Sequence, residues 1–162
     1  MKKIFLVILL IFIVYIALSL SFLDKYCFLC PVRYQDDFII RSDAMGNGFF
    51  GTRRSGRRTH QGIDLLAEVG EPVLAFRSGR VIQARKSKGM GNYIVLRHSP
   101  DLTTIYGHLL KIYAREGQFV RQGDIIGLVG KTGNANYNNM QAHLHFEIRR
   151  KNIPQDPLLY LD

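Results

Sequence analysis

Two short stretches of this chain carry histidines and acids at spacings that suit a metal centre or acid–base chemistry. In residues 141–148, polar and apolar residues alternate strictly, which predicts a β-strand because successive side chains on a strand point to opposite faces. His143, His145 and Glu147 then share one face, and the other face is apolar. A half-buried strand needs one apolar face, but it does not need two imidazoles on the other. His143 and His145 are therefore candidates for a functional site.

The second stretch is H-Q-G-I-D at residues 60–64. A neutral imidazole and a carboxylate are a natural pair of zinc ligands, although H-x-x-x-D alone is a weak signal that many chains contain by chance. Gly62 argues against a helix, so a bent strand or loop would bring His60 and Asp64 together. Glu147, on the histidine face of the later strand, is either an acceptor that orients a ligand imidazole or an ordinary surface residue.

The two remaining histidines have different surroundings. His108 lies at the predicted end of a strand beside Gly107, where a side chain can project into a cleft. His98 follows an apolar strand and precedes a turn at residues 99–101, so we expect a structural role for it.

The elements that must position these residues are predicted to be strands. A chain of 162 residues with 47% hydrophobic and 22% charged residues suits one globular domain with a buried core. Its 15 glycines stand singly between short apolar runs, which favours many turns. β-branched and aromatic residues predict an all-β fold with strands at residues 73–76, 80–84, 92–98 and 103–107 and a hairpin over 117–127. Beyond residue 23, no helix longer than two or three turns is required.

The amino-terminal segment predicts export. Lys2 and Lys3 precede an uncharged run over residues 4–23, and as a helix at about 1.5 Å per residue this run would span roughly 30 Å, the thickness of a bilayer core. We therefore predict a transmembrane anchor or a signal sequence at 1–23, a short stalk at 24–37 and the folded domain at 38–162.

Charge and cysteines add two open questions. The net charge of +9 predicts an acidic partner, and export argues against nucleic acid. Four arginines crowd the loop before the first motif and form either a solvated loop or a basic rim that steers an acidic substrate: Arg53, Arg54, Arg57 and Arg58. Cys27 and Cys30 form either a local disulfide or two idle thiols, and we assign them no catalytic role.

Taken together, the motifs closely resemble the LytM/lysostaphin-type zinc metallopeptidases of the M23 family. The resemblance rests on the order and spacing of T-H-Q-G-I-D-L at residues 59–65, Y-G-H-L at 106–109 and H-L-H-F-E-I at 143–148. G-E-P-V at 70–73 and G-D-I-I-G at 123–127 support it, so that the resemblance covers about residues 40–152. The combination is highly specific, although no single element is.

The resemblance implies a ligand set, catalytic residues and a fold. Members of this family bind zinc through the His and Asp of the first motif and the second His of the last, which are His60, Asp64 and His145 here. The other two motif histidines, His108 and His143, line the site and serve catalysis. The family fold is a compact antiparallel β-structure, barrel-sandwich-like, with a groove above the metal. Its usual substrates are the peptide cross-bridges of bacterial peptidoglycan.

The chemistry of these residue types agrees with that implication. Two neutral imidazoles and one carboxylate leave a fourth zinc position open, as in catalytic zinc sites, where the metal lowers the pKa of water towards neutrality. No H-E-x-x-H motif supplies a glutamate base, so proton transfer falls to an imidazole. Our hypothesis is that His143 takes the proton and that His108 supports it or stabilises the developing oxyanion.

Other interpretations are disfavoured on particular residues. Some relatives have lost catalytic residues and act as cell-wall-binding regulators or activators of a murein amidase, whereas all five motif positions are occupied here. A structural zinc site would need a fourth clear ligand. A biotinyl-type or lipoyl-type carrier would need a lysine at the tip of the 117–130 segment, where this chain has R-Q-G.

The sequence therefore predicts a zinc endopeptidase of the cell envelope, either anchored in the cytoplasmic membrane with its domain outside or secreted. Its expected partners are peptidoglycan, the membrane through the amino-terminal helix, and a regulatory protein that the sequence does not identify. Residues 134–142 are longer and richer in Asn than the usual family version, and we expect this loop to shape one wall of the groove.

Overall fold

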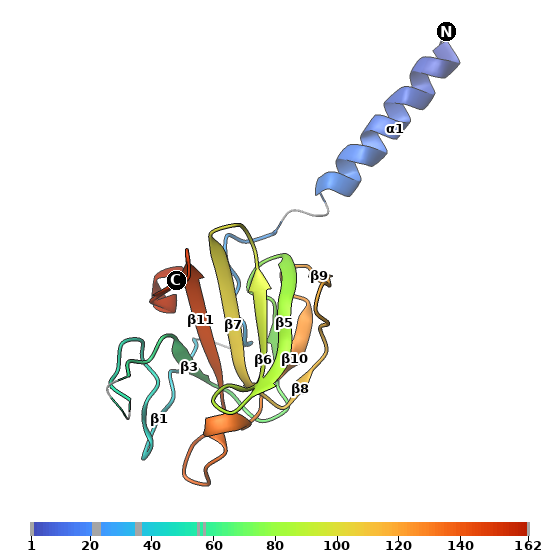
Figure 1. The fold of residues 1–162 in the computed structure, drawn as a ribbon. Coiled ribbons are helices and arrows are strands. Elements are labelled where there is room, and N and C mark those ends of the chain that lie inside the picture. Colours follow the sequence, from blue (N-terminus) through green and yellow to red (C-terminus); the bar gives the residue numbers. More distant parts are fainter. Residues whose placement is uncertain (1, 21–23, 35–36, 55, 57, 162) are drawn as a thin grey trace.

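A large antiparallel sheet carries the histidine motifs, and a smaller sheet shares its apolar core (Figure 1). The computed structural model describes residues 2–20, 24–34, 37–54, 56 and 58–161. The large sheet has the order β12-β11-β7-β6-β5-β9, with β3 paired to the first half of β11. Its strands are β3 (Ile63–Leu66), β5 (Gly79–Ser87), β6 (Gly91–Arg97), β7 (Leu102–Leu109), β9 (Phe119–Val120), β11 (His143–Arg150) and β12 (Ile153–Gln155).

The smaller elements complete the domain. The second sheet has the order β4-β10-β8, formed by β4 (Pro72–Leu74), β8 (Lys111–Ile112) and β10 (Ile125–Leu128). A two-stranded ribbon, β1 (Ser42–Asp43) and β2 (Gly46–Asn47), lies beside β3 (Figure 1). Two short 3-10 helices follow, η2 (Gly133–Ala135) and η3 (Pro157–Tyr160). All strand pairs are antiparallel, so the prediction of a β-rich antiparallel fold is confirmed.

The apolar face of β11 lies in the core, as the alternation of its sequence predicts. Leu144, Phe146 and Ile148 are fully buried. The ring of Phe146 packs against Tyr106 of β7 and against Phe76, with ring centroids 5.4 Å away in each case. This layer fixes β11 and β7 against each other, so the opposite faces of both strands have fixed positions too.

The prediction of a hairpin over residues 117–127 is wrong, because its two strands do not pair with each other. β9 pairs with β5 in the large sheet, whereas β10 pairs with β4 and β8 in the small one. The turn at residues 121–124 therefore passes the chain from one sheet to the other. Alternation and turn residues identify the two strands, but they do not say which partner each strand takes.

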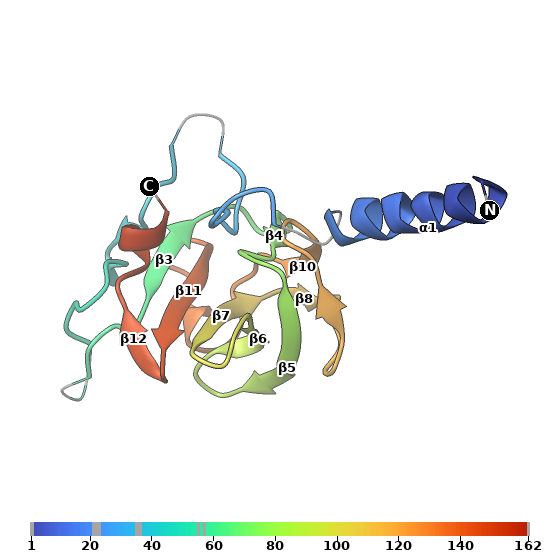
Figure 2. The same cartoon turned by 90° about the horizontal axis from the view of Figure 1, so that it is seen from above.

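Among the described residues one α-helix is present, α1 (Lys2–Leu20), and it stands apart from the β domain in both views (Figures 1 and 2). Within the described residues, no helix is both long and apolar enough to cross a membrane. The predicted membrane-spanning helix is therefore not supported. Part of the predicted span, residues 21–23, lies outside the described residues.

The first part of the predicted stalk lies along the domain. Asp24 accepts hydrogen bonds from the side chain of Arg77 (3.1 Å) and from Ser78. The ring of Phe28 stacks on Phe76 at 4.9 Å, and Val32 is buried with 2% of its surface exposed. Phe28, Cys30 and Val32 thus pack against the core, whereas residues 25–27 are exposed. The two cysteines in this segment are free thiols.

Candidate metal and catalytic site

Strand register brings the first pair of predicted ligands together. Asp64 on β3 and His145 on β11 are directly opposite partners in the antiparallel ladder. Side chains opposite each other on one face have close Cβ atoms, and the distance from Asp64 Oδ1 to His145 Nδ1 is 2.9 Å. Ile63 and Leu65, the neighbours of Asp64, point the other way and are fully buried.

β3 can approach β11 because Gly62 has no side chain. A Cβ at this position would lie 2.2 Å from the carbonyl oxygen of Phe146. Even alanine would therefore push the two strands apart. The glycine inside the H-x-x-x-D motif consequently serves the contact between the two motifs.

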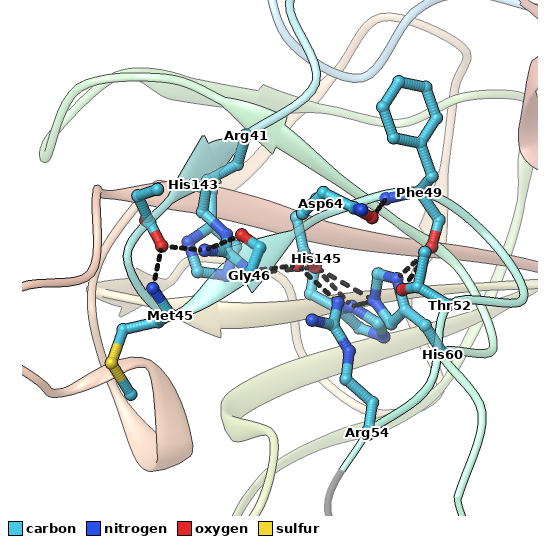
Figure 3. Close-up of polar contacts among 12 residues, drawn as sticks. Arg41, Met45, Gly46, Phe49, Thr52, Arg54, His60, Asp64, His143 and His145 are labelled. Atoms are coloured by element: carbon cyan, nitrogen blue, oxygen red, sulfur yellow. Dashed lines mark hydrogen bonds and ion pairs between the residues drawn. The ribbon is translucent and has the colours of Figure 1, made fainter.

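The loop before β3 places His60 beside the pair. The backbone N–H of His60 donates to the carbonyl of Thr52 (2.8 Å), and its carbonyl accepts from the N–H of Gly51 (2.9 Å). His60 Nε2 then lies 3.0 Å from His145 Nδ1 and 3.1 Å from Asp64 Oδ1 (Figure 3). The three predicted metal ligands thus converge, with their ligand atoms all about 3 Å from one another.

This cluster perturbs the proton affinity of its members. Burial alone would raise the pKa of Asp64, but the hydrogen bond from His145 and the adjacent His60 imidazole hold it well below its usual range. Burial alone would lower the pKa of His145, but its hydrogen bonds to Asp64 and Glu147 raise the pKa to about 9. Without a metal, the imidazole of His145 is therefore protonated on both nitrogens, and Nδ1–H donates to Asp64 while Nε2–H donates to Glu147.

The outer nitrogens of the two ligand imidazoles are each bound to an acceptor. The Nδ1–H of His60 donates to the carbonyl of Phe49 (2.9 Å), which leaves Nε2 with its lone pair towards the site. The Nε2–H of His145 donates to Glu147 Oε1 (3.1 Å), which leaves Nδ1 for the site. Such outer contacts fix the tautomer and orientation of metal-binding histidines.

Glu147 is therefore part of the site, which resolves the two roles open for it from sequence. Its side chain is buried, and its other oxygen accepts from Arg149 Nε at 2.7 Å. Arg149 in turn donates to Gln61 Oε1 at 2.7 Å. The sequence already placed Glu147 near the site, because it shares the face of β11 that carries His143 and His145.

His108 reaches the site through a bulge at the end of β7. The pairing of β6 with β7 shifts register so that β7 holds one extra residue before Leu109, and His108 has the left-handed backbone angle φ 62°. In an unbroken strand His108 would share the core face of Tyr106, two residues earlier. The bulge turns it instead towards His143 and His145, with ring centroids 5.1 and 5.7 Å away.

Both predicted catalytic histidines present an unprotonated Nε2 to the site. The Nδ1–H of His108 donates to the carbonyl of Thr132 (2.9 Å), and that of His143 donates to the carbonyl of Gln141 (2.7 Å). Burial, together with the neighbouring His145 and His143, lowers the pKa of His108 to about 3. Burial also lowers the pKa of His143, whose Nε2 lies 3.9 Å from Asp64 Oδ1.

Two arginines bind Asp64 that the sequence analysis did not assign to it. Arg41 Nη2 and Arg54 Nη2 lie 3.1 and 3.0 Å from Asp64 Oδ2 (Figure 3). Both contact the oxygen that does not face the histidines, so Oδ1 remains for a metal. Of the predicted basic rim, Arg54 thus turns inward, and Arg57 lies outside the described residues. His98 lies elsewhere, bonded to Ser78 and Thr104, which confirms its structural role.

The Asn-rich loop borders an open pocket of about 410 Å³ beside the site. The pocket is lined by Met45 of the β1–β2 turn and by the loop residues Asn136, Tyr137, Asn138 and Asn139. Tyr137 exposes 54% of its surface and Met45 exposes 42%. An exposed aromatic ring among amide groups provides a surface for a peptide or another polar ligand.

The donor set fits zinc. Ligands about 2.0–2.1 Å from a tetrahedral zinc lie roughly 3.3 Å from one another, and the three ligand atoms here are 2.9–3.1 Å apart. The outer nitrogen of each imidazole and the outer oxygen of the carboxylate have other partners, so the three inner atoms are the ones left for a metal. Two nitrogens and one oxygen leave one tetrahedral position open, which is the arrangement of catalytic zinc sites.

Comparisons with known proteins agree with this geometry. The family model for Peptidase family M23 matches residues 58–157. The chain is 38% identical over 112 residues to the "Lipoprotein NlpD/LppB homolog" of Pseudomonas aeruginosa, which covers 68% of this chain and 36% of that protein. It is 39% identical over 99 residues to "Peptidoglycan DD-endopeptidase ShyB" of Vibrio cholerae, covering 61% and 22%.

Two further matches bear on activity. The "Murein hydrolase activator NlpD" of Escherichia coli is 35% identical over 113 residues, or 69% of this chain and 28% of that protein. A solved structure of a "zinc containing peptidase from vibrio cholerae" has a TM-score of 0.63 and 36% identity, covering 77% of this chain and 37% of that one. The chain spans between about a fifth and just over a third of the length of the three relatives.

Proposed function

Because this chain belongs to peptidase family M23, we propose that it is a zinc-dependent endopeptidase that hydrolyses the peptide cross-links of bacterial peptidoglycan. One observation carries the proposal. His60 Nε2, Asp64 Oδ1 and His145 Nδ1 converge to within 3.1 Å of one another, while His143 and His108 face the same space with free Nε2 atoms.

The residues divide into a metal-holding set and a proton-handling set. His60, Asp64 and His145 would hold the zinc, which when bound supplies Lewis-acid polarisation of a peptide carbonyl and a water of lowered pKa. Arg41 and Arg54 keep the second oxygen of Asp64 away from this position.

His143 is the better placed general base. Its Nδ1–H is fixed on a carbonyl, its Nε2 faces Asp64, and its lowered pKa keeps it unprotonated at neutral pH. It can therefore accept a proton at Nε2 and later donate it to the leaving amine. His108 stays neutral as well, so it can stabilise an oxyanion only after it has taken up a proton at Nε2.

The substrate class follows from the relatives and from charge. A matched relative is named a peptidoglycan DD-endopeptidase, which favours a cross-link between D-amino acids. The net charge of +9 would attract the domain to an anionic wall polymer. We place the protein in the cell envelope, in line with the relative named a lipoprotein.

A second function is a catalytically silent activator of a murein hydrolase, because one relative is named as such. A silent member needs no base beside the ligand set. Here both proton-handling histidines are buried, hydrogen-bonded and directed at the ligands, which favours the enzyme. A protein partner that regulates the site is compatible with either function.

The test is turnover of purified peptidoglycan by the full chain, with added zinc and with a chelator. We expect chelator-sensitive conversion of cross-linked muropeptides into uncross-linked ones. His143→Ala should abolish turnover with its zinc content unchanged, whereas His98→Ala, the same change at a buried histidine away from the site, should leave turnover by the folded protein intact. Zinc binding without turnover by the unaltered protein would favour the activator, and failure to bind zinc would refute the zinc-dependent mechanism.

A further inference from the structure

A chain of polar contacts leads from the metal ligand Asp64 to the strand that carries the proposed base. Arg41 is 1% exposed and binds two carboxylates with one guanidinium: Nη2 lies 3.1 Å from Asp64 Oδ2, and Nη1 lies 2.6 Å from Asp43 Oδ1. Asp43 Oδ2 accepts the backbone N–H of Gln141 at 2.8 Å. The carbonyl of the same Gln141 accepts the Nδ1–H of His143 at 2.7 Å.

Asp43 is therefore connected to both halves of the site. Through Arg41 it reaches Asp64, and through Gln141 it reaches His143. It also binds the N–H of Met45 (2.8 Å), which closes the β1–β2 turn against the pocket. No other acid among the described residues bonds to the backbone of residues 134–142.

The chemistry of the pair suits a positioning role. A guanidinium buried this deeply needs carboxylate partners, because an unpaired buried charge is strongly destabilising. Its planar fork holds both carboxylates in fixed directions. As a result Asp64 has its outer oxygen restrained and presents one oxygen to the histidines. The loop before β11 is restrained at the residue that orients His143.

We infer that Arg41 and Asp43 act together as positioning residues that hold the metal ligand Asp64 and the segment Gln141–His143 in register with each other. Neither touches substrate or metal. The inference rests on the proposed zinc site, because it assigns these residues their effect through Asp64. It predicts that one change at Asp43 weakens metal binding and frees the loop at the same time.

The experiment compares Asp43→Asn with Asp101→Asn in the full chain. Both oxygens of Asp43 accept hydrogen bonds. Asn has one oxygen and one NH2 group, and the NH2 group would face a donor. Asp43→Asn therefore breaks at least one contact of this side chain. Asp101→Asn makes the same charge change on an exposed turn. Zinc affinity is measured by competition with a chromophoric chelator, and the backbone amide of Gln141 is followed by hydrogen exchange. Thermal unfolding of the metal-free proteins shows how much of each variant is folded.

We expect Asp43→Asn to weaken zinc binding by up to about 10-fold, at the lower end of the effect of losing a direct partner of a metal ligand, because Asp43 acts on Asp64 through Arg41. The Gln141 amide should also exchange faster, while Asp101→Asn changes neither quantity. Equal zinc affinity of folded Asp43→Asn and the unaltered protein would overturn the inference and leave the endopeptidase intact. If the unaltered protein binds no zinc, the proposed function fails instead.

A measurement on the unaltered protein keeps the inference testable should Asp43→Asn not fold. The Gln141 amide should then be protected from exchange to the same degree as the paired amides of β11. Exchange at the rate of an open loop would show that Asp43 does not hold Gln141, and the inference would be wrong.

Discussion

The proton on His145 makes the stability of the metal-free protein depend on pH. In the folded, metal-free state the pKa of His145 is about 9, against 6.5 in the unfolded chain. The folded state therefore binds this proton more tightly. The stability that protonation of His145 contributes is fully present below pH 6.5 and is lost as the pH rises through 9. Zinc at the proposed site would take the place of the proton at Nδ1, and the zinc-bound protein would then have no such proton to lose.

The size of the effect follows from the two pKa values. At 1.36 kcal/mol per pKa unit, the metal-free protein should lose about 2 kcal/mol of unfolding free energy between about pH 6.5 and 8.5. This figure is the contribution of His145 alone. His98, His108 and His143 act in the opposite direction, because burial lowers their pKa values in the folded state and the unfolded chain still binds protons near pH 6.5. Their contribution cancels when the protein is compared with a variant changed only at His145. A loss of this size is a large part of the stability of an ordinary domain, about 5–15 kcal/mol.

The assay is urea unfolding of the chelator-treated protein at several pH values, with unfolding free energies taken by linear extrapolation. His145→Gln is the matched variant, since an amide fills the same place without titrating, and its stability should not fall in this window by the same amount. Any change from Cys30, whose pKa burial raises, is common to both proteins and cancels in the comparison. If the stability of the metal-free protein does not fall relative to that of His145→Gln between pH 6.5 and 8.5, the raised pKa of His145 is refuted.

Three further changes test other parts of the structure. Glu147→Gln should weaken zinc affinity by about 10- to 100-fold through loss of the acceptor that orients a ligand imidazole, whereas Glu116→Gln on the exposed surface should not; a chelator competition titration measures both. Gly62→Ala should lower the unfolding free energy by about 1–3 kcal/mol, because its Cβ would lie 2.2 Å from a carbonyl of β11. Gly89 has open space around it, so Gly89→Ala should be nearly neutral in the same denaturation experiment. Tyr137→Ala should raise KM for cross-linked peptidoglycan with little change in kcat, and a lowered kcat at unchanged KM would argue against a binding role for the loop.

Strand periodicity predicts part of the candidate site from sequence, whereas the proposed ligand set itself comes from the resemblance to the M23 family. Alternation in residues 141–148 puts His143, His145 and Glu147 on one face, and the structure keeps them there. The fold class follows from the same periodicity and from the scattered glycines. What alternation does not contain is partner choice. β9 and β10 therefore read as a hairpin although they belong to different sheets.

The contacts that sequence missed depend on segments far apart in the chain. Arg41 and Asp64 are 23 positions apart, and no spacing rule links a lone arginine to a carboxylate on another strand. The histidine face was expected on a half-buried strand, yet it is buried as well, because the chain from Arg41 to Arg54 covers it. A buried Asp that binds a cation needs further charge partners, and this physical need is the one sequence-level sign that such arginines exist.

The left-handed backbone at His108 limits how far the thermal stability of this domain can be raised. For an L-residue that conformation costs roughly 1–2 kcal/mol, and glycine escapes it. The bulge that turns the imidazole into the site thus lowers the melting temperature of the whole molecule. If His108 serves catalysis as proposed, selection for thermal stability alone would favour its replacement and would yield stable but inactive variants. Directed evolution of this domain therefore has to screen for cleavage and for heat survival together.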